Sequence, residues 1–258
     1  MKKPFIYLAA FIAIYSYYHF HYKNVDTNII SKEQNFLIVG TSSDYPPYSQ
    51  IDLQTGQIVG LEIDLITEIA ERLNKKIILK DMPFNSLVIE LMSGQIDIIA
   101  AGLSPSQERS KSVLFSNPYI DNDDLIAVNK KSSPEITSIT DLYGKNIAVN
   151  TGYTSDVFLS NYPEIHLLRL KSTPDTIVAL RSDVVDAFVV ARSIFNLFLR
   201  EQSQDHNYQF FALPSSAEAY AFAYEKNNIK LKNQIDDILD VMIKNGTIET
   251  IKNKWTSA

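Results

Sequence analysis

The sequence of 258 residues contains no cysteine and only four histidines. The absence of cysteine excludes disulfide-stapled folds, thiolate metal sites, cysteine nucleophiles and a lipid-modified cysteine anchor. Lysine and arginine number 24 against 30 aspartates and glutamates, which gives a net charge of −6. This balance argues against a nucleic-acid partner, because phosphate binding needs clustered basic residues. The sequence also has no Gly-rich nucleotide loop and no metal-ligand spacing, so we expect neither a cofactor nor a metal.

Charged residues are absent from positions 4–22, which follow Lys2 and Lys3. Two lysines before an apolar run are typical of an export signal. The run is also long enough to span a bilayer, and its cleavage site is poor. We therefore interpret 1–24 as either a cleaved signal peptide or a membrane anchor, and the polar stretch 25–35 as a linker. Both interpretations place the rest of the chain in the periplasm or elsewhere outside the cytoplasm.

From Phe36 onward, apolar runs of strand length alternate with segments of helical periodicity. Strands are predicted at 36–40, 76–80 and 96–100, with helices at 61–73 and 86–92 between them. This order of elements indicates a parallel sheet with helices on its faces.

A second series of alternating elements follows and predicts a second sheet. A helix is predicted to begin with Thr173 as its N-cap and Pro174 in its first position, where proline is favoured. The other predicted elements are strands at 125–128, 146–149, 166–170, 184–190 and 220–224, and helices at 193–200 and 231–244.

The two series predict an α/β protein with two lobes. We expect lobe 1 to hold 36–121 and 219–258, and lobe 2 to hold 122–218, because strand 220–224 returns to the first lobe as an extra strand. Two segments then cross between the lobes. Ligands favour the carboxyl ends of strands and the interfaces between domains, so a binding cleft is expected between the lobes.

Several short segments occur in an order that is typical of one family. They lie at 40–48, 58–65, 84–87, 93–97, 101–109, 115–119, 141–145 and 245–255. Over about residues 36–255 the chain resembles the extracytoplasmic solute-binding proteins of family 3, the polar amino-acid receptors of ABC importers. The segments 45–47 and 119–122 look most like arginine-binding members. The resemblance implies a type II periplasmic-binding-protein fold with a two-segment hinge, each lobe being a mostly parallel sheet flanked by helices.

The resemblance also implies a set of ligand-binding residues. The matching arginine of the family, Arg109 here, holds the ligand α-carboxylate, and its planar fork suits two parallel hydrogen bonds. Tyr45 and Phe84 match positions whose rings sandwich the ligand side chain. The full implied set is Tyr45, Phe84, Gly102, Ser104, Arg109, Asn150 and Thr154.

The remaining implied residues lie in loops. Gly102 and Ser104 match positions that meet the ligand ammonium and carboxylate, whereas Ser106 is expected to cap locally. Thr154 precedes a short helix and is expected to donate its backbone amide to the carboxylate. Asn150 matches a position that often contacts the ligand side chain.

The sequence departs from the family pattern at Ala191. The family usually places there an aspartate that pairs with the ligand ammonium. Ser42 likewise stands where binders of basic amino acids often carry an acid. These two departures keep open a ligand without an ammonium, such as a small carboxylate.

The leading hypothesis is a monomeric binding protein without catalysis that captures a polar amino acid and delivers it to an ABC permease. One alternative is an enzyme on the same scaffold. It is disfavoured because none of the four histidines lies in a cleft motif where a general acid or base is needed. The other alternative is a ligand sensor tethered by an uncleaved first segment.

Overall fold

The computed structural model describes residues 35–201, 207–214 and 218–256. The chain divides into two units, 1–36 and 37–258, and the second unit holds the elements described below. The predicted signal or anchor at 1–24 and nearly all of the linker at 25–35 lie outside the described residues. Within the described ranges, no helix combines the length and apolarity needed to cross a membrane.

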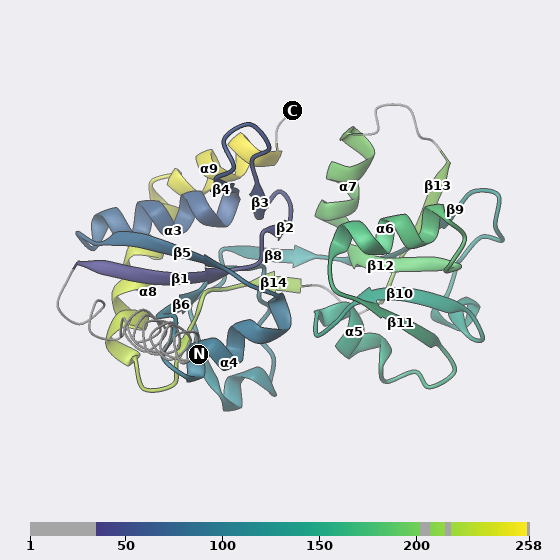
Figure 1. Ribbon diagram of the computed structural model, residues 1–258, viewed down its shortest axis with the longest axis horizontal. Coiled ribbons are helices and arrows are strands. Elements are labelled where there is room, and N and C mark those ends of the chain that lie inside the picture. The colour runs from purple at the N-terminus through teal and green to yellow at the C-terminus, as the bar shows by residue number, and fades with distance from the viewer. Residues whose placement is uncertain (1–34, 202–206, 215–217, 257–258) are drawn as a thin grey trace, which may run out of the picture. The chain divides into compact units, whose positions relative to one another are not determined.

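The first sheet has five strands in the order β5-β1-β6-β15-β7 (Figure 1). Strand β1 runs parallel to β6, whereas β15 runs antiparallel to both β6 and β7, so the sheet is mixed. The strands are β1 (Phe36–Thr41), β5 (Lys76–Asp81), β6 (Ile98–Ile99), β7 (Val113–Phe115) and β15 (Ala223–Glu225).

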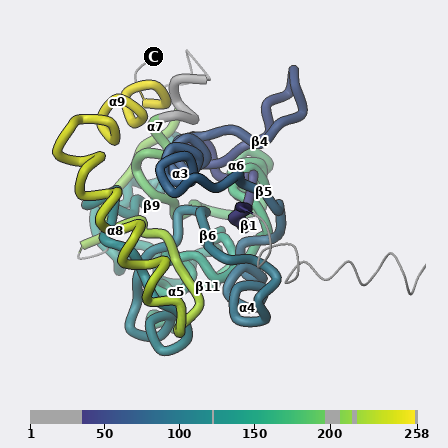
Figure 2. Tube along the Cα trace, turned by 90° about the vertical axis from the view of Figure 1, so that its left-hand side faces the viewer, coloured from purple at the N-terminus to yellow at the C-terminus, as the bar shows by residue number. Residues whose placement is uncertain are grey.

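Four helices accompany the first sheet. They are α3 (Leu61–Arg72), α4 (Leu87–Met92), α8 (Ile229–Lys244) and α9 (Thr247–Thr256). Helix α3 buries Leu61, Leu65 and Ile69, which lie four residues apart and therefore form one apolar stripe. Helix α4 packs against β6, and α3, α8 and α9 pack against one another. Figure 2 shows α8 and α9, in yellow, along one side of this part of the chain.

The second sheet has the order β11-β10-β12-β9-β13. Strands β11 and β12 run parallel to β10, whereas β9 runs antiparallel to β12 and β13. The elements are β9 (Leu125–Lys130), β10 (Asn146–Asn150), β11 (His166–Leu170), β12 (Ala187–Ala191), β13 (Tyr208–Ala212), α5 (Thr154–Leu159), α6 (Thr173–Arg181) and α7 (Arg192–Glu201).

Two short strands lie where the chain passes between the sheets. Strand β8 (Ile120–Asp123) precedes β9, and β14 (Glu218–Tyr220) precedes β15. They pair with each other in an antiparallel register that sets Glu218 opposite Asp123 (Figure 1). The single strand predicted at 220–224 is therefore two strands, one in the crossing and one in the first sheet.

Several smaller elements escaped prediction. A three-stranded sheet is formed by β2 (Asp44–Tyr45), β3 (Ser49–Ile51) and β4 (Ile58–Val59). Short 3-10 helices lie at Phe84–Ser86, Arg109–Lys111 and Ile139–Leu142. These elements are too short to show a hydrophobic period in the sequence.

The predicted cap of α6 is wrong by one residue. Ser172 is the N-cap, and its Oγ accepts the backbone N–H of Asp175 at 3.3 Å. Thr173 is already helical because its hydroxyl is engaged elsewhere and donates to Asn150 Oδ1 at 3.2 Å. Pro174 consequently lies in the first turn, one position later than predicted.

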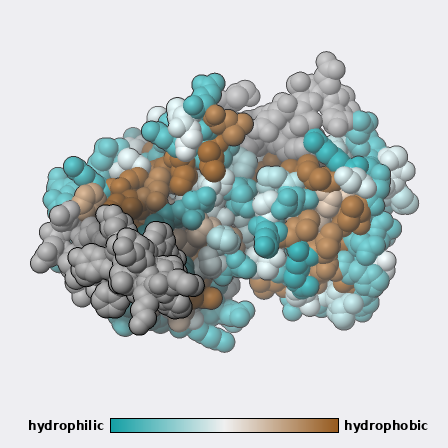
Figure 3. Space-filling view, viewed as in Figure 1, coloured by the Kyte–Doolittle hydropathy of each residue, from teal (hydrophilic) through white to brown (hydrophobic). Residues whose placement is uncertain are grey.

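Both β5 and β11 lie at an edge of their sheets. Lys76 and Lys80 in β5 and Arg169 in β11 place charge along these edges, which disfavours pairing with a second chain. Figure 3 shows apolar residues gathered over the second sheet and its helices, where Val178 of α6 and Leu168 of β11 are exposed. The charges on the edge strands thus disfavour association with a second chain, although part of the nearby surface is apolar.

Candidate functional site

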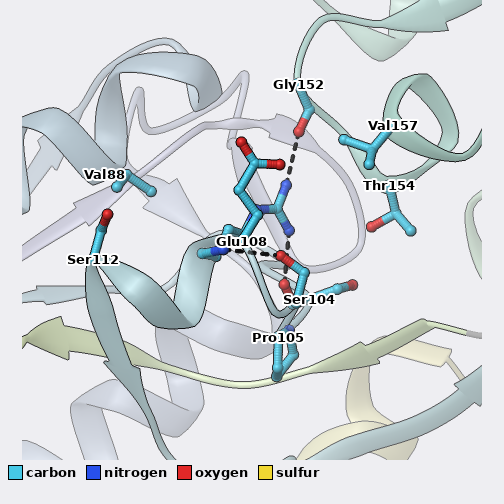
Figure 4. A pocket seen from close by; sticks show the side chains of 10 residues that line it. Val88, Ser104, Pro105, Glu108, Ser112, Gly152, Thr154 and Val157 are labelled. Carbon is cyan, nitrogen blue, oxygen red and sulfur yellow. Dashed lines mark hydrogen bonds between the residues drawn. The ribbon is translucent and has the colours of Figure 1, made fainter. Parts of the chain in front are cut away.

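Arg109 contacts loops that follow strands of both sheets. Its Nη1 donates to the backbone oxygen of Ser104, after β6, and its Nη2 donates to that of Gly152, after β10, each at 2.7 Å (Figure 4). The backbone N–H of Arg109 donates to Ser106 Oγ at 3.1 Å, so Ser106 acts as a local cap, as predicted. These bonds hold the guanidinium at the boundary between the two sheets.

A pocket of about 360 Å³ lies beside Arg109. Its volume falls within the range of small-molecule sites, roughly 300–1,000 Å³. Three of the predicted residues, Ser104, Arg109 and Thr154, line it, together with Val88 of α4 and Val157 of α5 (Figure 4). The pocket therefore has one cationic side chain, Arg109, one acidic side chain, Glu108, hydroxyl groups and apolar walls.

The charge of Arg109 is influenced by its surroundings. Burial lowers the pKa of the guanidinium, while the carboxylates of Glu218 and Glu108 oppose this shift. A guanidinium carries five N–H donors and keeps its charge in proteins. The bonds to Ser104 and Gly152 use two of these donors, so the fork retains others for a ligand anion.

The aromatic cluster consists of Tyr45, Tyr48, Phe84, Tyr153 and Tyr220. The ring of Tyr153 lies 5.4 Å from that of Tyr45 and 4.1 Å from that of Phe84, measured between centroids. Phe84 also lies below the Arg109 guanidinium, 5.7 Å from its ring centroid. The structure thus brings the predicted pair Tyr45 and Phe84 together through Tyr153. The sequence analysis assigned no ligand role to Tyr153, which directly precedes the predicted residue Thr154.

Gly102 occupies a position that only glycine fits. Its φ is +60°, and an added Cβ would lie 2.8 Å from the ring of Tyr45. Its backbone N–H donates to both carboxylate oxygens of Glu62 at 2.8 Å. Because the amide is already engaged by Glu62, the carbonyl is the group through which Gly102 can meet a ligand.

Two of the predicted residues carry buried polar atoms that lack a partner in the described part of the chain. They are Ser104 Oγ and Asn150 Nδ2. Buried polar groups are nearly always hydrogen-bonded, so such exceptions call for an explanation. Ser104 lines the pocket, whereas Asn150 does not and is held through its Oδ1 by Thr173.

Glu218 is a buried acid that the sequence analysis did not identify. Its side chain accepts a hydrogen bond from the hydroxyl of Tyr220 at 2.7 Å, and the hydroxyl of Thr154 lies close enough to lower its pKa. Burial raises the pKa of Glu218 to about 7, although these two hydroxyls and the charge of Arg109 act in the opposite direction. The sequence signal was present as a single acid within an otherwise apolar stretch, 218–224.

Glu62 is a second buried acid and lies on α3. It accepts hydrogen bonds from Gly102 and from the hydroxyl of Tyr119. Burial raises the pKa of Glu62 to about 7 against the effect of these bonds. Its contacts make Glu62 the support of the Gly102 loop.

Ala191 ends strand β12 and is 1% exposed. It pairs with Leu125 of β9 and packs in an apolar cluster. This position therefore contributes neither a charge nor a hydrogen-bonding side chain to the site.

Comparisons with known proteins agree with this arrangement. The arginine-binding extracellular protein ArtP of Bacillus subtilis (strain 168) is 30% identical over 225 residues, which is 85% of each chain. A mutant of ArgBP from T. maritima superimposes with a TM-score of 0.82 at 32% identity and covers 90% of this chain and 99% of its own. An ancestral arginine-binding protein bound to arginine gives a TM-score of 0.80 at 31% identity, with 86% and 98% covered.

A sequence model of the bacterial extracellular solute-binding proteins, family 3, matches residues 37–258. The predicted two-lobed α/β fold is confirmed by these matches, and so is the prediction of a solute-binding protein rather than an enzyme. The chain therefore belongs to the bacterial extracellular solute-binding proteins of family 3.

Proposed function

We propose that this protein captures a polar amino acid between its two sheets and delivers it to an ABC permease. The observation that carries the proposal is the placement of Arg109, which touches the loops after β6 and β10 and lines the pocket. A ligand carboxylate on this guanidinium would be held by groups from both sheets. Two parallel charge-assisted bonds suit a carboxylate better than any other common anion except phosphate.

The proposed site comprises the seven predicted residues. Arg109, Ser104 and Thr154 meet the carboxylate end of the ligand, and Gly102 offers its carbonyl. Tyr45 and Phe84 provide apolar walls, with Asn150 near the ligand side chain. The relatives named for arginine favour a basic amino acid as the ligand.

The proposed organisation follows the predicted boundaries. Lobe 1 comprises 36–121 and 219–258, and lobe 2 comprises 122–218, with β8 and β14 as the two hinge segments. The protein works as a monomer outside the cytoplasm, where it meets its permease. Residues 1–24 act as a signal peptide or as a tether.

Titration calorimetry with L-amino acids tests this function on the purified protein and on Arg109→Ala. Loss of the fork should weaken binding at least a hundredfold, which corresponds to about 3 kcal/mol. Arg109→Lys should not restore it, because an ammonium lacks the planar fork. Arg72→Ala serves as the matched control, since Arg72 pairs with Glu68 on the surface of α3. Unchanged affinity in Arg109→Ala would contradict the proposal.

A further inference from the structure

We propose that Glu218 binds the α-ammonium of the amino acid whose carboxylate Arg109 holds. The inference rests on the proposed function and names the group that recognises the second half of the ligand's zwitterion. It predicts that the ligand carries an ammonium, in contrast to the alternative of a small carboxylate without one.

Glu218 lies on β14, one of the two strands that cross between the sheets. The hydroxyl of Thr154, in α5 after β10, lies close enough to the carboxylate to lower its pKa. The hydroxyl of Tyr220 bonds it from within β14, and Tyr220 in turn contacts the hydroxyl of Tyr45 at 3.0 Å. The carboxylate therefore faces groups from both sides of the predicted cleft.

Thr154 lies close to both the pocket and Glu218. It lines the pocket beside Arg109, and its hydroxyl is near enough to the carboxylate of Glu218 to lower its pKa. The charges of Arg109 and Glu218 also interact, since each shifts the pKa of the other. A cation and an anion are thus set close together in a buried site. An α-amino acid presents the complementary pair, because its carboxylate and ammonium are attached to one carbon.

The other acids near the site have different partners. Glu62 bonds Gly102 and Tyr119, and Asp123 bonds the backbone and hydroxyl of Ser193. Glu108 lines the pocket and acts on Arg109, but it is exposed to water, which weakens its charge interactions. Glu218, at 6% exposure, is the buried acid that Arg109 attracts. It can therefore supply the charge that Ala191 does not.

Burial is compatible with the same assignment. It raises the pKa of Glu218, while Arg109 favours the ionised form and Asp123 on β8 opposes ionisation. Tyr45, Tyr48 and Tyr153 have pKa values raised well above 10, so they stay neutral near pH 7. A ligand ammonium beside the carboxylate would favour its ionised form.

The test compares amino acids with analogues that lack the α-ammonium. L-Arginine, L-histidine and L-glutamine are titrated calorimetrically, each beside its deamino analogue, into wild type and Glu218→Gln. Of the three amino acids, the one that wild type binds should bind at least tenfold more tightly than its deamino analogue. Glu218→Gln should weaken the affinity for the amino acid roughly 10- to 100-fold, as expected for one charge-assisted bond. The same variant should change the affinity for the analogue less than about threefold.

Glu71→Gln is the matched control, because it makes the same substitution at an exposed position of α3 outside the residues that line the pocket. It should leave both affinities within about threefold of wild type. Equal loss for amino acid and analogue in Glu218→Gln, or no loss, would overturn the inference while leaving the proposed function intact. Equal binding of amino acid and analogue by wild type would overturn it without any variant. Absence of binding by all three amino acids would overturn the proposed function as well.

Discussion

At Gly102 the backbone takes a φ of +60° with the ring of Tyr45 directly against it. Gly102→Ala should lower the free energy of unfolding by about 2–4 kcal/mol, since it adds left-handed strain and a clash with the ring. Denaturant unfolding measures this loss. Gly56→Ala is the matched control, because Gly56 has a φ of +70° and open space around it. A loss at Gly102 no larger than that at Gly56 would contradict the tight contact with Tyr45.

Glu62 makes stability depend on pH. Its pKa is about 7 in the folded protein against an ordinary value of 4.5, so the folded state holds the proton more tightly. The resulting stabilisation is complete below about pH 4.5 and is lost as the pH rises through 7. The Glu62→Gln variant has no proton to lose at this position. Between pH 4 and pH 8, the unfolding free energy of wild type should therefore fall by roughly 3 kcal/mol more than that of Glu62→Gln. A difference that is independent of pH would show that Glu62 titrates normally.

The sequence located some site residues and missed others for a physical reason. Arg109 and Ser104 were predicted because they lie within a contiguous segment that resembles the family. Tyr153 and Glu218 acquire their significance only through contacts with Phe84, Thr154 and Tyr220. Glu218 comes close to Thr154 through the fold rather than through the sequence, so neither segment alone reveals the contact.

Among the elements, long apolar segments were easier to predict than the short strands that cross between the two sheets. Strand β11 matches its predicted range, 166–170, because a run of strand length is bounded by turns. Strands β8 and β14 have four and three residues, and their pairing with each other carries no local sequence signal. The mixed direction of both sheets was likewise missed, because strand order and direction depend on distant connections.

The start of α7 is tied to the crossing strand β8. Ser193 donates its backbone N–H to Asp123 Oδ1 at 3.1 Å and its hydroxyl to Oδ2 at 2.5 Å. Its Oγ also lies 3.1 Å from the hydroxyl of Tyr48, the residue directly before β3. Ser193 thus links the second sheet, the crossing and the region of the small sheet.

Ser193→Ala removes the hydroxyl that joins Asp123 and Tyr48. It should lower the unfolding free energy by about 1–3 kcal/mol, because Asp123 loses a buried bond to its charge. The affinity for the amino acid should also fall, because the variant destabilises the arrangement of the two sheets that binds the ligand. The control is Ser172→Ala, which removes the hydroxyl that accepts the backbone N–H of Asp175, a helix cap worth about 1 kcal/mol. Equal effects of the two variants on affinity would contradict a linking role for Ser193.

In the whole molecule, the two charges of the proposed amino-acid ligand meet groups that lie between the two sheets. Arg109 belongs to the loop after β6 and reaches Gly152 after β10. Glu218 belongs to the crossing strand β14 and lies near Thr154 of α5. A ligand that engages both charges favours the arrangement in which the sheets meet, by the difference in its affinity for the two arrangements.

The most direct test of this claim is the affinity of wild type for an L-amino acid compared with the amide of the same amino acid. The amide keeps the ammonium and the side chain but loses the anion that Arg109 binds. Calorimetry should show the amide binding at least a hundredfold more weakly, as expected from the loss of two charge-assisted bonds worth about 3 kcal/mol. Equal affinity for the acid and its amide would contradict the account.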